Sequence, residues 1–317
     1  MISDSKKQQL ATKYIFKNSF KPRDLDKLSI QELFFLIKSC ELFKSEEGFD
    51  NEGLNERIAL FEDVAKNKLN QLDTLYVLYD NSTSYLYYDD IDAVELFTSS
   101  EYAERALDFY RNKQHRNLRI VSYSRKTIFD LFSEINRLGL KNILVDKGQF
   151  SYKFQSDELL YLKNDNEEMP FMSQSLMEAC IKFFTQIRWQ INYKDKENIL
   201  DELQSIMFDE IKKANYLVPI KHVSENKESN EEVTLHFAKI EIRPNNLSYL
   251  PLFSDWIEFE KVYDKDEYDC LVMNFDDLIQ LLKNNVYDGL LLNPRGINFI
   301  MNSNLINNIQ QSNDEKY

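Results

Sequence analysis

A pair of carboxylates is the first group in this chain whose type and spacing could do chemistry. Tyr87-Tyr88-Asp89-Asp90 has the Y-x-D-D pattern, in which two carboxylates hold two magnesium ions for phosphoryl transfer. No second acidic strand and no basic groove for a template accompany it, and the formal net charge of the chain is −14. We therefore interpret this pattern as a solvated hairpin turn.

Metal ligands and nucleophiles also lack their usual spacing. The acidic run at Asp264, Asp266 and Asp269 could suggest calcium, but Asp269 and Phe275 stand where an EF-hand loop needs glycine and glutamate. The histidines show no close spacing to one another or to a cysteine, and no C-x-x-C is present. With six glycines in all, a phosphate-cradling loop is hard to build. The sequence predicts no catalytic residue, metal or cofactor, and hence no enzyme.

The turn Asn293-Pro294-Arg295-Gly296 is the best candidate for binding. Proline fixes φ and glycine permits positive φ, so a rigid turn would present Arg295, a cation able to capture a carboxylate or phosphate. Lys147 takes the corresponding place in the first half. A well-formed turn that carries a basic side chain is the alternative. The predicted binding residues, some at this turn and some flanking it, are Arg295, Asp288, Asn293, Tyr249 and Trp256.

Two short sequence patterns near these residues each occur twice in the chain. Leu96-Phe97-Thr98-Ser99 is answered by Leu252-Phe253-Ser254-Asp255, each at a strand end before a helix. Ile143 to Gly148 is answered by Leu291 to Gly296, 148 residues later. A repeat of that length indicates a duplicated domain rather than a solenoid.

Both halves also have the same predicted order of elements. Each begins with two helices, continues with a strand meander, and ends with helix, strand, helix and strand. The capping boxes Ser29/Glu32 and Ser175/Glu178 start helices. Expected strands of the first half are 75–79, 85–88, 93–97, 119–123, 143–145 and 151–154. Those of the second half are 216–220, 233–242, 249–253, 270–273 and 290–292, and its later helices are 255–263 and 275–284.

The predicted fold class is α+β, with two tandem modules that each have a mixed β-sheet flanked by helices. Residues 1–24 form a polar N-terminal segment, 25–160 the first module, 161–172 a linker, and 173–317 the second module. The linker is placed at the polar run before Pro170.

Composition narrows the classes of function. Hydrophobic residues make up 43% of the 317 residues, which suits two globular cores. The acidic surface argues against nucleic-acid and membrane partners. Three distant cysteines, without a signal peptide or an apolar stretch long enough to span a membrane, favour a cytoplasmic location. The abundance of Asn, Lys and Ile suggests a bacterial source.

The second module resembles the SseB (enhanced serine sensitivity) domain family. Leu250 to Asp255, the helix at Asp276-Asp277-Leu278, and Asp288 to Gly296 carry the resemblance, over roughly the last 80 residues. The first module matches more weakly, because Leu96 to Ser99 lacks the proline and Val145 to Gly148 replaces Asn-Pro-Arg-Gly. The resemblance implies an α/β module with no catalytic residue to carry over, and it makes the second module the better candidate for an ancestral site.

These patterns favour a non-catalytic adaptor that binds another protein. Two modules in one chain would imitate a homodimer, so we expect a monomer or a pseudo-dimeric monomer. The expected partner is a protein, and the acidic surface favours a basic one. Two alternatives stay open. One is an immunity-type inhibitor of a basic toxin. The other is a small-molecule-binding regulator with its site near the Asn293–Gly296 turn.

Overall fold

The computed structural model describes residues 2–17, 20–46, 48–88, 92–159, 171–221, 236–284 and 287–312. They contain helices and three β-sheets, which confirms the predicted α+β class. Asp89, Asp90, the charged insert 225–232 and most of the predicted linker lie outside the described residues.

Two compact units make up the fold. Unit 1 comprises Met1–Tyr79, Leu86–Asn136 and Leu140–Lys163. Unit 2 comprises Asp80–Tyr85, Arg137–Gly139 and Asn164–Tyr317, so it takes in two short segments of the first half. The module boundaries expected from the sequence stay a prediction.

A helical layer opens unit 1. Its helices are α1 (Asp4–Ala11), the π-helix η1 (Thr12–Phe16), the 3-10 helix η2 (Pro22–Lys27), α2 (Ile30–Lys44) and α3 (Asn51–Asn70). The Ser29 hydroxyl accepts from the Glu32 N–H and the Glu32 carboxylate accepts from the Ser29 N–H, so the predicted capping box is confirmed. The N-terminal segment 1–24, predicted to be polar, also contributes to the core, because Leu10, Tyr14 and Ile15 are buried.

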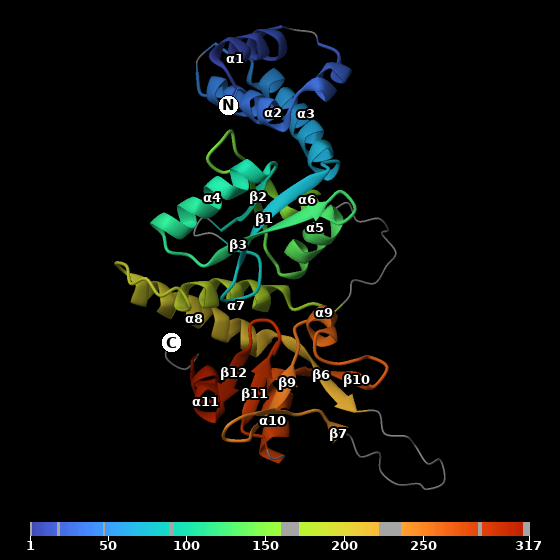
Figure 1. The fold of residues 1–317 in the computed structure, drawn as a ribbon, viewed down its shortest axis with the longest axis vertical. Coiled ribbons are helices and arrows are strands. Elements are labelled where there is room, and N and C mark those ends of the chain that lie inside the picture. Colours follow the sequence, from blue (N-terminus) through green and yellow to red (C-terminus); the bar gives the residue numbers. More distant parts are fainter. Residues whose placement is uncertain are drawn as a thin grey trace. The chain divides into compact units, whose positions relative to one another are not determined.

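A five-stranded mixed sheet follows, in the order β3-β1-β2-β4-β5 (Figure 1). Its strands are β1 (Thr74–Asp80), β2 (Val94–Phe97), β3 (Leu118–Ser124), β4 (Asn142–Val145) and β5 (Tyr152–Gln155). The helices between and after them are α4 (Ser100–Lys113), α5 (Ile128–Arg137) and α6 (Ser156–Leu159). β2 and β4 run parallel, with Leu96 opposite Val145. Phe97, Tyr110 and Leu118 are among the side chains that form the core between α4 and the sheet.

Unit 2 begins with a helix pair that packs together, and then builds two sheets (Figure 1). Its helices are α7 (Gln174–Ile187), α8 (Lys196–Lys213), α9 (Trp256–Glu260), α10 (Phe275–Asn284) and α11 (Ser303–Gln311). Its strands are β6 (Asn215–Lys221), β7 (His236–Phe237), β8 (Ile240–Ile242), β9 (Leu247–Leu252), β10 (Tyr268–Asn274), β11 (Gly289–Leu292) and β12 (Phe299–Asn302). The orders are β10-β6-β7 and β12-β11-β9-β8.

One backbone pair joins the two sheets of unit 2. Leu217 in β6 and Phe253, just after β9, exchange N–H···O bonds of 2.9 and 3.0 Å. Through this pair the strands β10, β6, β9, β11 and β12 follow one another as β3, β1, β2, β4 and β5 do in unit 1. The parallel pair is again the third with the fourth strand. This shared order supports the duplication, which itself stays a prediction.

Several predicted elements are wrong in detail. Residues 85–88 form isolated bridges rather than a strand, with Leu86 opposite Tyr79 and Tyr88 opposite Val94. Helix α7 starts at Gln174 after Ser173, so Ser175 caps nothing. Helix α9 ends at Glu260, short of the expected helix 255–263, and Asp255 is its cap, since its carboxylate accepts from the Glu258 N–H. Residues 236–242 are two short strands instead of one. β12 and α11 were missed, because no glycine or proline separates them from the polar C-terminal segment.

Candidate functional site

Asn293, a predicted binding residue, is fully buried and holds a turn together. Its side-chain oxygen accepts from the Ser254 N–H at 3.0 Å, and its amide donates to the Ser254 hydroxyl at 2.9 Å and to the Met177 sulfur at 3.2 Å. Its φ is +45°, a value that asparagine tolerates better than most residues. Asn293 is therefore a structural residue of the turn, and no face of it is open to a ligand.

Arg295 and Trp256 lie near the same end of β11 and β9. The Arg295 guanidinium is exposed and donates to the Lys261 carbonyl at 2.7 Å, which anchors it to the end of α9. Trp256, the first residue of α9, is 37% exposed beside the exposed Ile257. These two residues form the part of the predicted site that a partner could touch.

Asp288 and Tyr249 belong to the opposite end of these strands. Asp288 accepts from the Ser248 N–H at 2.6 Å just before β11, and Tyr249 is buried opposite Gly289. The four residues of β11 separate Asp288 from Asn293, about 16 Å at roughly 3.3 Å per residue. The structure thus divides the five predicted residues into two groups, and a site that uses both Asp288 and Arg295 is not formed. Their binding role stays a prediction.

The first half has the same turn, built on Asp146. The Asp146 N–H donates to the Leu96 carbonyl at 2.8 Å, as the Asn293 N–H donates to Leu252 at 2.9 Å. Asp146 has a φ of +55° and is fully buried. Its carboxylate accepts from the Thr98 N–H and hydroxyl, both at 2.7 Å. Burial raises the pKa of this carboxyl, although the hydrogen bonds from Thr98 and Gln31 oppose the shift.

These bonds correct the sequence alignment by one position. Asp146, rather than Val145, corresponds to Asn293, so Lys147 corresponds to Pro294 and not to Arg295. The positive φ of the second turn also lies at Asn293, whereas Gly296 has none. The cations of the two halves therefore occupy different places.

A buried charge cluster lies beside the second turn, within unit 2. The Arg137 guanidinium donates to the carboxylates of Asp255 at 2.8 Å and Glu258 at 3.2 Å. Lys261 adds an ion pair to Glu258 at 2.6 Å. The side chains of Arg137, Asp255 and Glu258 are all at most 6% exposed. Two cations balance two carboxylates, so the cluster fixes the start of α9 rather than offering charge to a ligand.

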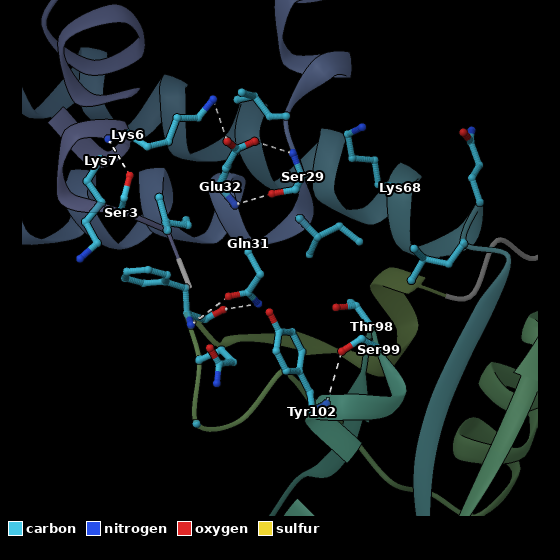
Figure 2. A pocket seen from close by; sticks show the side chains of 18 residues that line it. Ser3, Lys6, Lys7, Ser29, Gln31, Glu32, Lys68, Thr98, Ser99 and Tyr102 are labelled. Atoms are coloured by element: carbon cyan, nitrogen blue, oxygen red, sulfur yellow. Dashed lines mark hydrogen bonds and ion pairs between the residues drawn. The ribbon is translucent and has the colours of Figure 1, made fainter. Parts of the chain in front are cut away.

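A large cleft lies wholly within unit 1. It has a volume of about 1190 Å³ and is lined by 18 residues. Its walls are α1, the first turn of α2, the end of α3, the junction of β2 with α4, and the turn after β4 (Figure 2). Sequence analysis missed it, because these five segments are far apart in the chain and none carries a recognisable motif.

Gln31 fixes the shape of this cleft. Its amide donates to the Asp146 carboxylate at 2.6 Å and to the Phe150 carbonyl at 3.2 Å, and its oxygen accepts from the Phe150 N–H at 3.2 Å. Figure 2 shows Gln31 and Tyr102 projecting toward each other from α2 and α4. Gln31 thus ties the helical layer to the β4 turn and holds the walls in register.

The lining of the cleft is basic, in contrast to the chain as a whole. It contains Lys6, Lys7 and Lys68 and a single carboxylate, Glu32. Burial opposes ionisation of Glu32, but hydrogen bonds from Ser29 and the Lys6 ammonium, 3.0 Å away, outweigh it and lower the pKa. Lys68 donates to the Asp26 carbonyl at 2.8 Å, and Lys7 pairs with Asp4 at 2.9 Å. Leu28, Leu72 and Phe150 add apolar surface.

The cysteines are free thiols in the structure. Cys40 and Cys180 are buried, whereas Cys270 in the edge strand β10 is half-buried. Among the described residues no group of three His, Cys, Asp or Glu side chains is arranged to hold a metal ion. No described helix is long and apolar enough to cross a bilayer.

Comparison with known proteins bears on the second half. Residues 200–307 match the family model described as SseB protein N-terminal domain. The predicted resemblance to the SseB family is confirmed over that range, which runs from α8 to α11. No curated protein matches the chain.

Two solved structures are similar to larger parts of the chain. The first is Anabaena Tic22, whose description names protein transport. It is 11% identical to this chain with a TM-score of 0.18, and the alignment covers 69% of this chain and 87% of the Tic22 chain. Tic22 from Plasmodium falciparum has 13% identity and a TM-score of 0.18, with coverage of 78% and 96%.

Proposed function

We propose that this chain is a non-catalytic protein-binding protein whose cleft in unit 1 captures an acidic, partly apolar polypeptide segment. The observation that carries the proposal is the cleft itself. Its volume of about 1190 Å³ exceeds the range of about 300–1,000 Å³ that is usual for small-molecule pockets. A segment of several residues would fill it.

The charge of the lining supports an acidic segment. Three lysines face one glutamate, and that glutamate is already bound by Ser29 and Lys6. Lysine ammonium groups at an interface attract and orient carboxylates, and they discriminate against basic segments. The acidic remainder of the chain still allows a basic partner elsewhere on the surface, so the immunity-type reading stays a prediction with a different site.

The chemistry of the lining supports binding rather than catalysis. The described residues of the cleft include no histidine or cysteine, and Glu32 has a lowered pKa and two bound partners. A general base needs a free carboxylate or imidazole with a pKa near neutrality. A cytoplasmic location belongs to the same proposal, supported by the three free thiols.

Site-specific photo-crosslinking in the native host tests this function. A photoreactive residue replaces Gln71, which lines the cleft, or Arg111, an exposed position of α4 outside it, in the full chain. We expect one protein to crosslink at Gln71 and not at Arg111, through a segment rich in Asp and Glu, as mass spectrometry of the crosslinked peptide would show.

Charge reversal provides the matched control. Lys7→Glu with Lys68→Glu is expected to weaken capture at least tenfold, which corresponds to about 1.4 kcal/mol. Lys126→Glu with Lys153→Glu makes the same change in net charge at exposed positions outside this cleft, and it should leave capture unchanged. Equal loss in both double variants, or a basic crosslinked segment, would overturn the proposal.

A further inference from the structure

A second, smaller cleft lies in unit 1 between α4 and the turn after β4. Its volume is about 350 Å³. It shares Tyr102, Gly148 and Gln149 with the large cleft, but its other walls are its own. The volume falls in the usual range for sites that enclose a small organic molecule.

The base of this cleft is a hydrogen-bonded group of three side chains, Glu95, Tyr110 and Lys147. Glu95 on β2 is completely buried, and one of its oxygens accepts from both the Tyr110 hydroxyl and the Lys147 ammonium. Lys147 also donates to the Tyr110 oxygen at 2.7 Å. Glu95 and Tyr110 thus hold the Lys147 ammonium in one place, while the Lys147 side chain stays 36% exposed.

The walls of the cleft are largely apolar. Ala106 and the ring of Tyr102 pack on the core beneath α4 and present their outer faces to the cleft. Phe109 is 51% exposed and lines the cleft. Arg105 stands at the rim, 5.1 Å from the centre of the Tyr102 ring and ion-paired with Glu101.

We propose that this cleft binds a small organic carboxylate with an aromatic or aliphatic body. The carboxylate meets Lys147 and Arg105, and the body packs against Tyr102, Ala106 and Phe109. Lys147 and Arg105 outnumber Glu95, the one carboxylate in the lining; Glu101, which pairs with Arg105, is not part of the lining. An ammonium ligand is disfavoured, because it would have to approach these cations to reach Glu95.

The corresponding described positions of unit 2 do not form this site. Glu95 lies opposite Leu144 as Pro251 lies opposite Leu291, and Lys147 corresponds to Pro294. Neither proline can supply a charge. The first half thus has a site of its own, although the second half is the part that matches the SseB model.

Calorimetric titration of the full chain tests this site. The probes are 3-phenylpropionate and hexanoate, with their amides as neutral analogues of the same shape. We expect saturable binding of at least one acid at one molecule per chain, and at least tenfold weaker binding of its amide, because the amide brings no charge to Lys147.

Three variants locate the binding. Phe109→Ala removes an exposed wall and should weaken the acid at least fivefold, and Ala106→Trp should abolish binding by filling the cleft. Phe129→Ala, which alters an equally exposed phenylalanine on α5, should change nothing. Circular dichroism establishes that each variant is folded. Absence of saturable binding of both acids at millimolar concentration overturns the proposal, as does an amide that binds as well as its acid, or binding that survives in a folded Ala106→Trp chain.

Discussion

The Asp146 carboxylate accepts two hydrogen bonds from Thr98, one from the backbone N–H and one from the hydroxyl, each of 2.7 Å. Asn293 bonds to the same two groups of Ser254, but it accepts from the N–H at 3.0 Å and donates to the hydroxyl at 2.9 Å. In both turns a buried side chain at positive φ ties the end of one strand to the end of its parallel neighbour. Asp146 can carry a charge and Asn293 cannot, so the stability of the first turn depends on pH.

Replacing Asp146 separates its charge from its hydrogen bonds. Asp146→Asn keeps the backbone conformation and the hydrogen bonds to Thr98 but loses the hydrogen bond from Gln31. We therefore expect the free energy of unfolding at neutral pH to fall by about 1 kcal/mol. Asp146→Ala also loses the Thr98 bonds, and alanine tolerates positive φ less well than aspartate does, so we expect the free energy of unfolding to fall by about 2–4 kcal/mol. Urea unfolding of the two variants measures both values.

The pH dependence of the Asp146 variants has a defined sign. Because the pKa of Asp146 is raised by folding, the folded chain holds this proton more tightly than the unfolded chain does. The stabilisation is complete below the ordinary pKa of 3.8 and is lost as pH rises through the raised value. The stability of the native chain relative to Asp146→Asn should therefore fall as pH rises in this window. Exposed Asp108→Asn serves as the control. A difference that grows with pH would contradict the prediction.

Position 296 requires glycine because neighbouring side chains approach its backbone closely, and not because of its φ. A β-carbon there would lie 2.0 Å from the Tyr85 hydroxyl oxygen and 2.6 Å from a Glu258 oxygen, closer than real contacts allow. Both neighbours are buried in unit 2, so we expect Gly296→Ala to lower the free energy of unfolding by about 1–3 kcal/mol.

Gly48→Ala is the matched control for Gly296→Ala. Gly48 has a φ of +98°, and no atom lies within 4 Å of the position that a β-carbon would take, so alanine there meets conformational strain of about 1 kcal/mol and no clash. A Gly296→Ala chain that unfolds at the same urea concentration as the native chain would show that Tyr85 and Glu258 are not held in place.

Local signals let the sequence predict many elements. The Ser29/Glu32 capping box marks the start of α2, and the expected helix 275–284 has the bounds of α10. Period-two and period-3.6 patterns depend on neighbours in the chain, which is why they survive folding. The strand predicted at residues 85–88 is wrong because that prediction also rests on the local pattern alone. Their apolar side chains resemble a strand, but the carbonyl and carboxylate of Asp80 accept from Ser84 and Ser82 and bend the chain before pairing can extend.

The candidate site could be predicted only in part. The sequence marks the Asn293 turn, because proline and asparagine act locally there. The predicted strand 290–292 already separates Asp288 from Arg295, but only strand register places Tyr249 opposite Gly289, at the Asp288 end. The sequence also does not show that Gln31 meets Asp146, or that Lys147 meets Glu95. Such contacts join segments more than 50 residues apart, and no local pattern encodes them.

Arg137 neutralises two buried carboxylates, so its removal should be costly. Arg137→Met keeps most of the side-chain volume but leaves Asp255 and Glu258 to repel each other, with Lys261 the remaining cation of the cluster. We expect a loss of about 3–5 kcal/mol in the free energy of unfolding. Fluorescence of Trp256, which follows Asp255, reports the local transition. Arg125→Met, at an exposed arginine, should change stability by less than about 0.5 kcal/mol. Equal effects of the two variants would refute the role of the cluster.

The three thiols should react slowly in the folded chain. Burial raises the pKa of Cys40 to about 11 and those of Cys180 and Cys270 to about 12, so little thiolate forms at pH 8. Since the thiolate is the nucleophile, an aromatic disulfide reagent at pH 8 should modify the native chain at least a hundredfold more slowly than the urea-unfolded chain.

The order of reaction distinguishes access from acidity. Cys180 and Cys270 share nearly the same raised pKa, but Cys180 is buried and Cys270 is half-buried in the edge strand β10. If access decides, Cys270 reacts first and at a rate independent of urea below the transition, whereas Cys40 and Cys180 react only as fast as their surroundings open. Mass spectrometry of peptides from a partly modified sample measures this order. A sample in which all three cysteines are modified together would mean that the reagent reaches them only through global unfolding.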